Sequence, residues 1–387
     1  MKKNHLKIIA ASFLLATTVT LQSCSNNDDD PIVIPPTGIA LDPNNFQGEI
    51  KNGETVTLDP SKIYKLTGAI MVKTGGRLVI PAGTRVEANG GTSSFITVEQ
   101  GGQLYANGTA TSPVVFTSNN HIPGAWGGIV LCGKAPGNKG NNATAEVGNA
   151  TYGGTIVNDN SGALTYVRIE YAGALHHTEK EFNGLSLFGV GNGTKIDNIS
   201  IINGSDDGIE FFGGTVNVSN IILVGNEDDA FDWTEGWNGT ATNIFSKRRT
   251  DGTGNRGIEA DNNSSNNNAD PRSNPTIKNA TFIGTTSGES DGLKLREGTY
   301  GNLDNIVLSG WKTGINIEHD ASVAYFNGGG KITNINFVNV STESSAKATG
   351  GATVEVKSNT FTKNNNATGA GNGINIPTWA AGWSGVN

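Results

Sequence analysis

Short runs of alternating apolar and polar residues recur through the central part of the chain, and each contains a glycine or alanine at its start. The runs read NGLSLFG, DGIEFFG, DAFDWTEG, RGIEADN, DGLKLREG and TGINIEHD, with that residue at Gly184, Gly208, Ala230, Gly257, Gly292 and Gly314. Successive positions lie 24, 22, 27, 35 and 22 residues apart. Alternation with a period of two predicts strands that bury one face, and no helical period of 3.6 residues competes with it. The chain is therefore predicted to be all-β.

A second pattern runs in phase with the first and places an asparagine after an apolar residue and one further residue. It reads IDNISI, VSNIIL, ATNIFS, IKNATF, LDNIVL and ITNINF, with Asn198, Asn220, Asn243, Asn279, Asn305 and Asn334, and LTYVRIEY has Tyr166 at that position. Two phase-locked strand patterns predict a parallel β-helix, in which equivalent positions of successive coils stack about 4.8 Å apart. Longer steps are then loop insertions, and stacked asparagine amides are expected to bond from coil to coil. A sandwich of several sheets is the alternative, but it would not keep both patterns in phase.

Alternation also assigns the faces of the first strand pattern. The first and third residues after each glycine or alanine are expected to point inward, and the second and fourth outward. One outward column then contains Glu210, Asp232, Glu259 and Lys294, and the column beside it contains Phe188, Phe212, Asp261 and Arg296. We expect Phe188, Glu210, Phe212, Asp232, Glu259, Lys294 and Arg296 to form an exposed ligand-binding face.

Repeated carboxylates at this spacing repel one another unless a cation, a proton or a basic side chain intervenes. Ca²⁺ is one solution, because it accepts six to eight oxygen ligands in flexible geometry, and the expected ligands are Asp206, Asp207, Asp228 and Asp229. A pair of carboxylates acting in glycoside cleavage is a second solution. A solvated face, with the side chains splayed outward, is the third.

The N-terminal sequence predicts the compartment. Lys2, Lys3 and Lys7 precede an apolar stretch at residues 8–21 that is too short to span a bilayer, as in a secretory signal peptide. The stretch ends in LQSC, which looks like a bacterial lipobox and implies cleavage after residue 23 and lipidation of Cys24. We expect a signal peptide at 1–23, an acidic and Pro-rich tether at 24–44 and one β-helix domain at 45–387.

Composition narrows the partners. The whole chain has a formal charge of −8, and loss of the signal peptide leaves 24 basic and 35 acidic side chains, a charge of −11. Nucleic acid is therefore not an expected partner. The expected attachment to the membrane is the lipid on Cys24, and Cys132 is the one thiol that remains, so no intrachain disulfide is expected.

The segments GAWGGIVLCGKA, LTYVRIEYAG and NGLSLFGVGNGTKIDNISI together resemble the β-helical outer-membrane lipoproteins of Bacteroidota, which implies a right-handed solenoid. The acidic stretch SNNDDD after Cys24 is similar to their surface-export signal and implies a position on the outer face of the outer membrane. Polygalacturonases and pectate lyases share this fold. The Asn-Thr-Asp and Gly-His-Gly motifs of polygalacturonases are missing here, so no catalytic residue is transferred from them.

The sequence therefore favours a surface lipoprotein whose outer sheet binds a glycan, or a partner protein in an outer-membrane uptake complex. A polysaccharide lyase or glycoside hydrolase is the first alternative, and a structural or adhesive rod is the second. An enzyme should bring acids and Lys or Arg together with perturbed pKa values, whereas a binding module should expose aromatic rings. The coil ends are expected to be capped by residues 36–60 and by the tail, with Trp379 and Trp383 closing the last coil.

Overall fold

The computed structural model describes residues 39, 41–177 and 180–386. The chain divides into two compact units, Met1–Pro35 and Pro36–Asn387, and every described residue belongs to the second. The expected signal peptide, the lipidation site Cys24 and most of the 24–44 tether lie outside the described residues. Within the described ranges, no helix is long and apolar enough to cross a bilayer.

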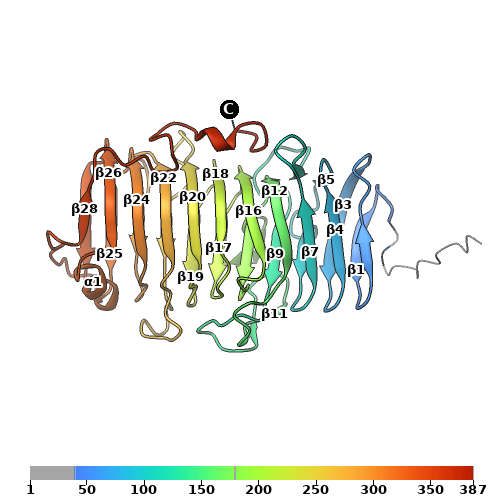
Figure 1. The fold of residues 1–387 in the computed structure, drawn as a ribbon, viewed down its shortest axis with the longest axis horizontal. Coiled ribbons are helices and arrows are strands. Elements are labelled where there is room, and N and C mark those ends of the chain that lie inside the picture. The colour runs from blue at the N-terminus through green and yellow to red at the C-terminus, as the bar shows by residue number, and fades with distance from the viewer. Residues whose placement is uncertain (1–38, 40, 178–179, 387) are drawn as a thin grey trace, which may run out of the picture. The chain divides into compact units, whose positions relative to one another are not determined.

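The second unit is a parallel β-helix, a stack of coils whose strands pair with the next coil along one axis (Figure 1). Its strands form three parallel ladders. The first contains β2 (Thr55–Thr57), β4 (Arg77–Pro81), β7 (Gln103–Asn107), β28 (Phe361–Lys363) and the first halves of β12 (Gly162–Glu170), β16 (Lys195–Ile202), β18 (Val218–Val224), β20 (Thr240–Lys247), β22 (Thr276–Ile283), β24 (Asn302–Ser309) and β26 (Ile332–Val338). The second contains the first half of β3 (Ile63–Val72), β5 (Arg85–Ala88), β8 (Val114–Thr117) and the second halves of those long strands.

The third ladder carries the predicted ligand-binding face. It contains β1 (Phe46–Ile50), the second half of β3, β6 (Ile96–Val98), β9 (Ile129–Cys132), β15 (Leu185–Phe188), β17 (Ile209–Phe212), β19 (Phe231–Thr234), β21 (Ile258–Ala260), β23 (Asp291–Leu295), β25 (Thr313–Glu318) and β27 (Thr342–Lys347). The remaining elements are α1 (Asp320–Phe326), the 3₁₀ turn η1 (Thr378–Ala380), and two antiparallel hairpins, β10 (Ala143–Thr144) with β11 (Thr151–Tyr152) and β13 (Leu175–His177) with β14 (Lys180–Glu181).

The asparagine pattern marks the corner between the first and second ladders. Asn220, Asn243, Asn279 and Asn305 all have φ between 56° and 59°, and Tyr166 has φ of 50°. Asparagine tolerates this left-handed conformation better than most residues because its amide bonds locally. The amide of Asn243 donates to Asn220 at 2.9 Å, that of Asn279 to Asn243 at 3.2 Å, and that of Asn305 to Asn279 at 2.9 Å. The fold class is confirmed, and so is the asparagine stack from Asn220 to Asn305. At its two ends the amides of Asn220 and Asn334 donate to Asp197 and Asp304 instead of to the predicted asparagines.

The predicted inward positions form the core between the ladders. The first and third residues of the repeated run are all fully buried: Leu185, Leu187, Ile209, Phe211, Phe231, Trp233, Ile258, Ala260, Leu293, Leu295, Ile315 and Ile317. The period of two was therefore sufficient to assign the interior, because a shift of one residue would have turned every side chain to the other face.

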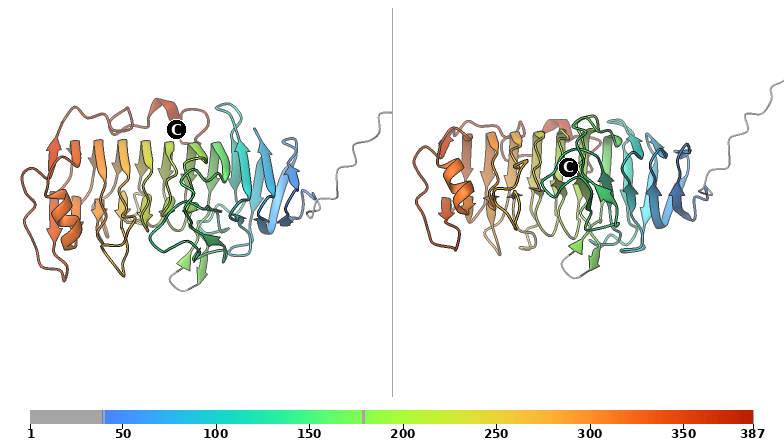
Figure 2. Two further views of the ribbon diagram at one scale, coloured as in Figure 1. Left: turned by 60° about the horizontal axis from the view of Figure 1, so that its bottom comes forward. Right: turned by 90° about the horizontal axis from the view of Figure 1, so that it is seen from below.

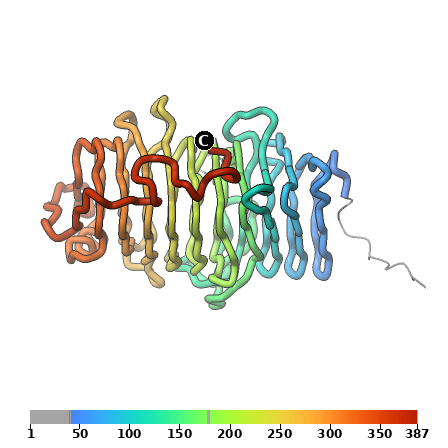
Figure 3. The backbone as a smooth tube through the Cα atoms, turned by 45° about the horizontal axis from the view of Figure 1, so that its top comes forward, coloured from blue at the N-terminus to red at the C-terminus, as the bar shows by residue number. Residues whose placement is uncertain are grey.

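The C-terminal segment, residues 364–386, does not cap the last coil as expected. It turns back and runs along the outside of the stack, over β24, β22, β20, β18 and β16 (Figures 1 and 3). Trp383 is buried there against the outward side chains Ile222 and Phe245. The hydroxyl of Ser200 donates a hydrogen bond to the carbonyl of Ser384 at 2.7 Å. The tail covers a side face because that face carries an apolar column that would otherwise meet water.

Loop insertions emerge from the third ladder near β9, β15 and β17 (Figure 2). The β10–β11 insertion places Ala145, Val147 and Tyr152 against the outer face of β15 and β17. Part of the face that the sequence predicted to be exposed is therefore covered by the chain itself.

Candidate functional site

The strand register places the outward acids of the third ladder directly beside one another. Glu210 pairs with Asp232, Asp232 with Glu259, and Glu259 with Lys294 in successive strands. We call Glu210, Asp232 and Glu259 the acid column. Residues 22 and 27 positions apart in the sequence thus become lateral neighbours, as the repeat predicted.

The turns before β17 and β19 bring four more carboxylates to the same edge, and we call Asp206, Asp207, Asp228 and Asp229 the turn acids. Asp207 Oδ1 accepts the backbone N–H of Asp229 at 2.9 Å, and Asp229 Oδ1 accepts the N–H of Arg256 at 2.7 Å. These bonds tie each turn to the next coil, so the turn acids have fixed positions relative to the column.

Carboxylate oxygens of the two groups approach one another closely. In three overlapping sets, one oxygen from each residue lies within 4.8 Å of the others: Asp206, Asp207 and Asp228; Asp207, Glu210 and Asp232; Asp229, Asp232 and Glu259. Three of the four predicted metal ligands therefore share one set. The fourth, Asp229, faces the acid column instead.

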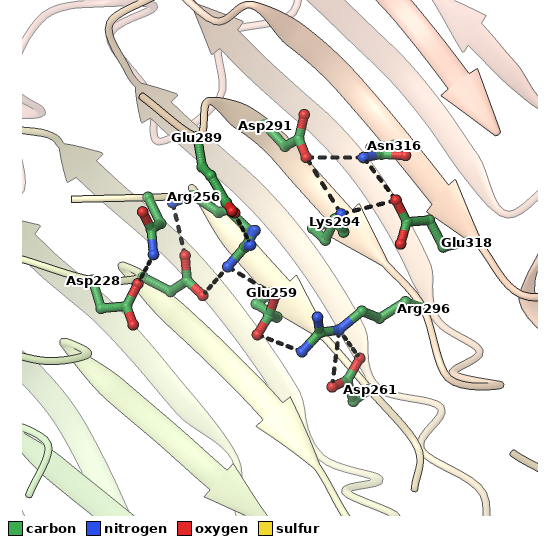
Figure 4. A network of polar contacts seen from close by, with 12 residues as sticks. Asp228, Arg256, Glu259, Asp261, Glu289, Asp291, Lys294, Arg296, Asn316 and Glu318 are labelled. Carbon is green, nitrogen blue, oxygen red and sulfur yellow. Dashed lines mark hydrogen bonds and ion pairs between the residues drawn. The ribbon is translucent and has the colours of Figure 1, made fainter. Parts of the chain in front are cut away.

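Basic side chains compensate the later end of this site (Figure 4). The Arg256 guanidinium pairs with Asp229 at 3.1 Å and with Glu259 at 2.9 Å, and it also contacts Glu289. Arg296 pairs with Glu259 and Asp261, both at 2.8 Å. The acids of β21 are thus held in a network of ion pairs.

Lys294 lies one strand further on. Its ammonium pairs with Glu318 at 2.9 Å and lies 3.9 Å from Asp291 (Figure 4). Of the two predicted cations, Arg296 therefore reaches the acid column at Glu259, whereas Lys294 pairs with acids outside it.

The earlier end of the site has no such compensation. Glu210 accepts a hydrogen bond from the Asn183 amide at 2.6 Å, and Asp232 Oδ1 is buried with no hydrogen-bond partner in the described part of the chain. Burial raises the pKa of Asp207, Glu210 and Asp232 well above the ordinary carboxyl range, and neighbouring carboxylates raise it further. Burial, with Glu181 and Asp228 nearby, raises the pKa of Asp206 to about 8.

Residues 48–384 match the family model of the pectate-lyase-like β-helix domain. The chain belongs to this family. A search of curated proteins and a search of solved structures gave no match. Membership of the family establishes the fold of the pectate-lyase-like domain, whereas the chemistry of its surface depends on its own side chains.

Three further acids of the pectate-lyase-like domain act on Glu210 or Asp206 and are not among the predicted ligand-binding or calcium-binding residues: Glu146, Glu181 and Glu235. Burial and the nearby Glu235 raise the pKa of Glu146 to about 7, and burial also raises the pKa of Glu235, which accepts a hydrogen bond from Tyr152. Burial raises the pKa of Glu181 on β14. Glu146 and Glu181 lie in insertions without a period, so no repeat pointed to them. Glu235 directly follows β19, and the equivalent residue after β17 is Gly213, so no recurring acid pointed to Glu235 either.

Phe188 and Phe212 are not exposed, and the expectation of an aromatic platform was wrong. Their rings stack at 4.0 Å in adjacent strands, as the register required. However, Phe188 is 1% and Phe212 6% exposed, because the β10–β11 insertion packs Tyr152 and its neighbours over them. A ligand cannot stack on these rings in the folded domain.

The two arginines of the site are poor bases. Burial opposes the charged guanidinium of Arg296, but Asp261 and Glu259 outweigh it and raise the pKa above its ordinary value. Asp229 and Glu259 do the same for the pKa of Arg256. An elimination that needs a neutral arginine to remove a proton is therefore disfavoured at these positions, whereas oxygen ligation of a cation and carboxyl acid–base chemistry are both open.

Proposed function

We propose that this protein is a lipid-anchored surface β-helix that binds a divalent cation in its turn acids and acid column and, through that site, a glycan. The observation that carries the proposal is the uneven distribution of charge along the site. In each of the three sets, the carboxylate oxygens lie within 4.8 Å of one another. Arg256 and Arg296 neutralise the set that contains Glu259. In the described ranges no ion pair joins a cation to the two sets that contain Asp207. Burial raises the pKa of Asp228, although Arg256 and Arg296 lower it from a distance.

The chemistry of these residues fits calcium. All the donors are carboxylate oxygens, the ligands that hard cations prefer, and they belong to turns and strands already fixed by backbone bonds. The buried Asp232 Oδ1 without a hydrogen-bond partner supports the fit, because a buried polar atom is normally satisfied. Asp206, Asp207 and Asp228 would hold one ion. Glu210 and Asp232, together with Asp207, would be the ligands of a second ion position. A bound cation would supply positive charge for sugar hydroxyl or carboxylate oxygens.

The proposed compartment rests on the sequence outside the described residues. Cleavage before Cys24 and its lipidation would place the domain on the outer membrane, and the acidic SNNDDD stretch supports display on the cell surface. There the domain would present its third ladder to a polysaccharide or to an uptake complex.

Calcium titration of residues 36–387, followed by melting with and without chelator, tests the cation site. We expect saturable stabilisation by Ca²⁺ and its loss in Asp206→Asn/Asp228→Asn. Asp304→Asn is the matched control, because Asp304 lies on β24 and bonds Thr333 and Asn334 outside the site. No stabilisation at millimolar calcium, or equal stabilisation in both variants, would contradict the site. A soluble chain that also fails to bind any glycan would act as a structural rod.

Glycoside hydrolysis is the second candidate, and it is favoured by acids of different environment in adjacent strands. Asp232 has a pKa raised well above its ordinary range, and burial raises that of Asp261 to about 6 although Arg296 lowers it. Such a pair suits a protonated acid beside an ionised carboxylate. This meets the criterion set above for an enzyme better than the aromatic criterion for a binding module. Release of reducing ends from a polysaccharide panel, abolished in Asp232→Asn, would establish it.

A further inference from the structure

A basic cavity lies on the other side of the same turns. It has a volume of about 440 Å³, and its lining includes three cations and one acid, Lys247, Arg248, Arg249 and Asp251, and the apolar Val224, Ile376 and Val386. The first strand residues come from the ends of β18 and β20, whereas Ile376 and Val386 come from the C-terminal segment. The cavity therefore exists only because that segment returns to the middle of the stack, and we call it the strap cavity.

Arg248 gives the strap cavity a buried positive charge. Arg248 is buried, with 8% of its surface exposed. Its guanidinium donates to the backbone carbonyls of Thr253 at 3.2 Å, Glu289 at 2.8 Å and Gly252 at 2.8 Å. These three bonds use three of its five N–H donors and bring no carboxylate into an ion pair with it.

Lys247 adds a second cation at the exposed edge. Among the residues that the structure describes, its ammonium forms no hydrogen bond or ion pair. Arg249 differs, because it pairs with Asp251 at 2.7 Å and with Glu227 at 3.3 Å. Asp251 and Glu227 are thus paired with Arg249, and within the described residues neither Lys247 nor Arg248 forms an ion pair of its own.

The remaining walls are apolar. Val224, Ile376 and Val386 belong to the cluster that packs around Trp383 and Phe245. A cavity with two cations outside any ion pair on one side and aliphatic side chains on the other is complementary to an anionic group attached to a less polar body. Balancing nearby carboxylates is the other use of such cations. It explains Arg249 fully and Arg248 in part, because Asp229 and Asp251 act on the Arg248 guanidinium without pairing with it, but it does not explain Lys247.

We propose that the strap cavity binds an oxyanion, a phosphate or sulfate ester, with Lys247 and Arg248 holding the anion and Ile376 and Val386 contacting its organic carrier. This site shares no residue with the acid column. It does not depend on the cation proposal, and it assigns a ligand-binding role to the C-terminal segment. Both a phosphorylated lipid headgroup and an esterified sugar have the required chemistry.

Calorimetric titration of residues 36–387 with inorganic phosphate and sulfate, in buffer of low chloride, tests the anion site. We expect saturable binding that weakens about tenfold in Lys247→Ala and is lost in Lys247→Glu, as removal of one charge-assisted contact requires. Lys312→Ala is the matched control, because Lys312 is also exposed but lies between β24 and β25, outside the cavity. Binding that is absent at 20 mM anion, or unchanged by Lys247→Glu, would overturn the proposal.

The carrier is identified by repeating the titration with glucose 6-sulfate, glucose 6-phosphate and dihexanoyl phosphatidic acid. Ile376→Ala should weaken binding of the preferred ester severalfold and leave inorganic phosphate unaffected. If Ile376→Ala weakens all ligands equally, or none, the apolar wall has no role in recognition and that part of the proposal fails.

Discussion

Raising the pH from 5 to 8 in the presence of a chelator should weaken the folded domain, because its site contains carboxyl groups whose pKa values are raised by burial. A group with a pKa raised in the folded state stabilises the fold below its unfolded pKa, and this contribution is lost as the pH rises through the folded pKa. Asp206, with a pKa of about 8 against an ordinary 3.8, loses its contribution across this whole range.

The magnitude follows from linkage. Between pH 4 and pH 7, Asp206 is protonated in the folded chain and ionised in the unfolded chain. Each rise of one pH unit therefore lowers the free energy of unfolding by about 1.4 kcal/mol. From pH 4 to pH 7, Asp206 alone therefore lowers the free energy of unfolding by on the order of 4 kcal/mol. Glu146, with a pKa of about 7, changes in the same direction. Their effects are not additive, because the carboxyls interact.

Urea titrations at pH 5, 6, 7 and 8 measure the free energy of unfolding with chelator and with calcium. We expect it to fall with pH in chelator, to fall less in Asp206→Asn, and to be restored by calcium most strongly at pH 8. Asp304→Asn should lower it equally at all four pH values, because hydrogen bonds from Thr333 and Asn334 lower the pKa of Asp304 and keep it ionised throughout. A free energy that is flat or rises with pH in chelator, or an Asp206→Asn variant as steep as the parent chain, would refute the reasoning.

Three further predictions concern the fold. Trp383→Ala should cost the docked C-terminal segment about 3 kcal/mol, seen as faster amide exchange in residues 364–386 while β16 to β22 keep their protection. Asn243→Ala should destabilise the chain by about 3 kcal/mol, through two lost amide bonds and a strained left-handed backbone, and Asn243→Gly by less because only the bonds are lost. If Asn243→Ala and Asn243→Gly lower the free energy of unfolding equally, strain in the left-handed backbone does not contribute. Cys132, fully buried and with its thiol pKa raised by burial, should react with a disulfide reagent only at the rate of unfolding, and immediate labelling would contradict its placement.

The repeat predicted the coils because it depends on local alternation that is repeated in phase. The inward positions, the asparagine corner and the neighbours in the acid column all followed from counting residues. Phe188 and Phe212 show where that reasoning stops. They occupy outward positions as expected, but an insertion between β9 and β12, which has no period, folds over them.

The site was predictable to the same extent. Asp207, Asp228 and Glu210 were found because they recur in the turns and strands, whereas Glu146 and Glu181 come from insertions whose path depends on tertiary packing. The course of the C-terminal segment was missed for a similar reason. Ile222 and Phe245 point outward from the second ladder, and they are buried because the C-terminal segment, distant in sequence, packs its own apolar side chains on them.

The return of the C-terminal segment changes how the stack should respond to mechanical force. A solenoid pulled from one end unpeels coil by coil, since each coil contacts only its neighbours. Here the Ser200 hydroxyl holds the carbonyl of Ser384, a residue 184 positions later, so tension applied at the C-terminus enters the stack at β16 and not at β28. The last coils bear no load until the segment has been stripped from β16 to β24. Force on the C-terminus would thus peel this segment from the stack, and disrupt the strap cavity, before any coil opens.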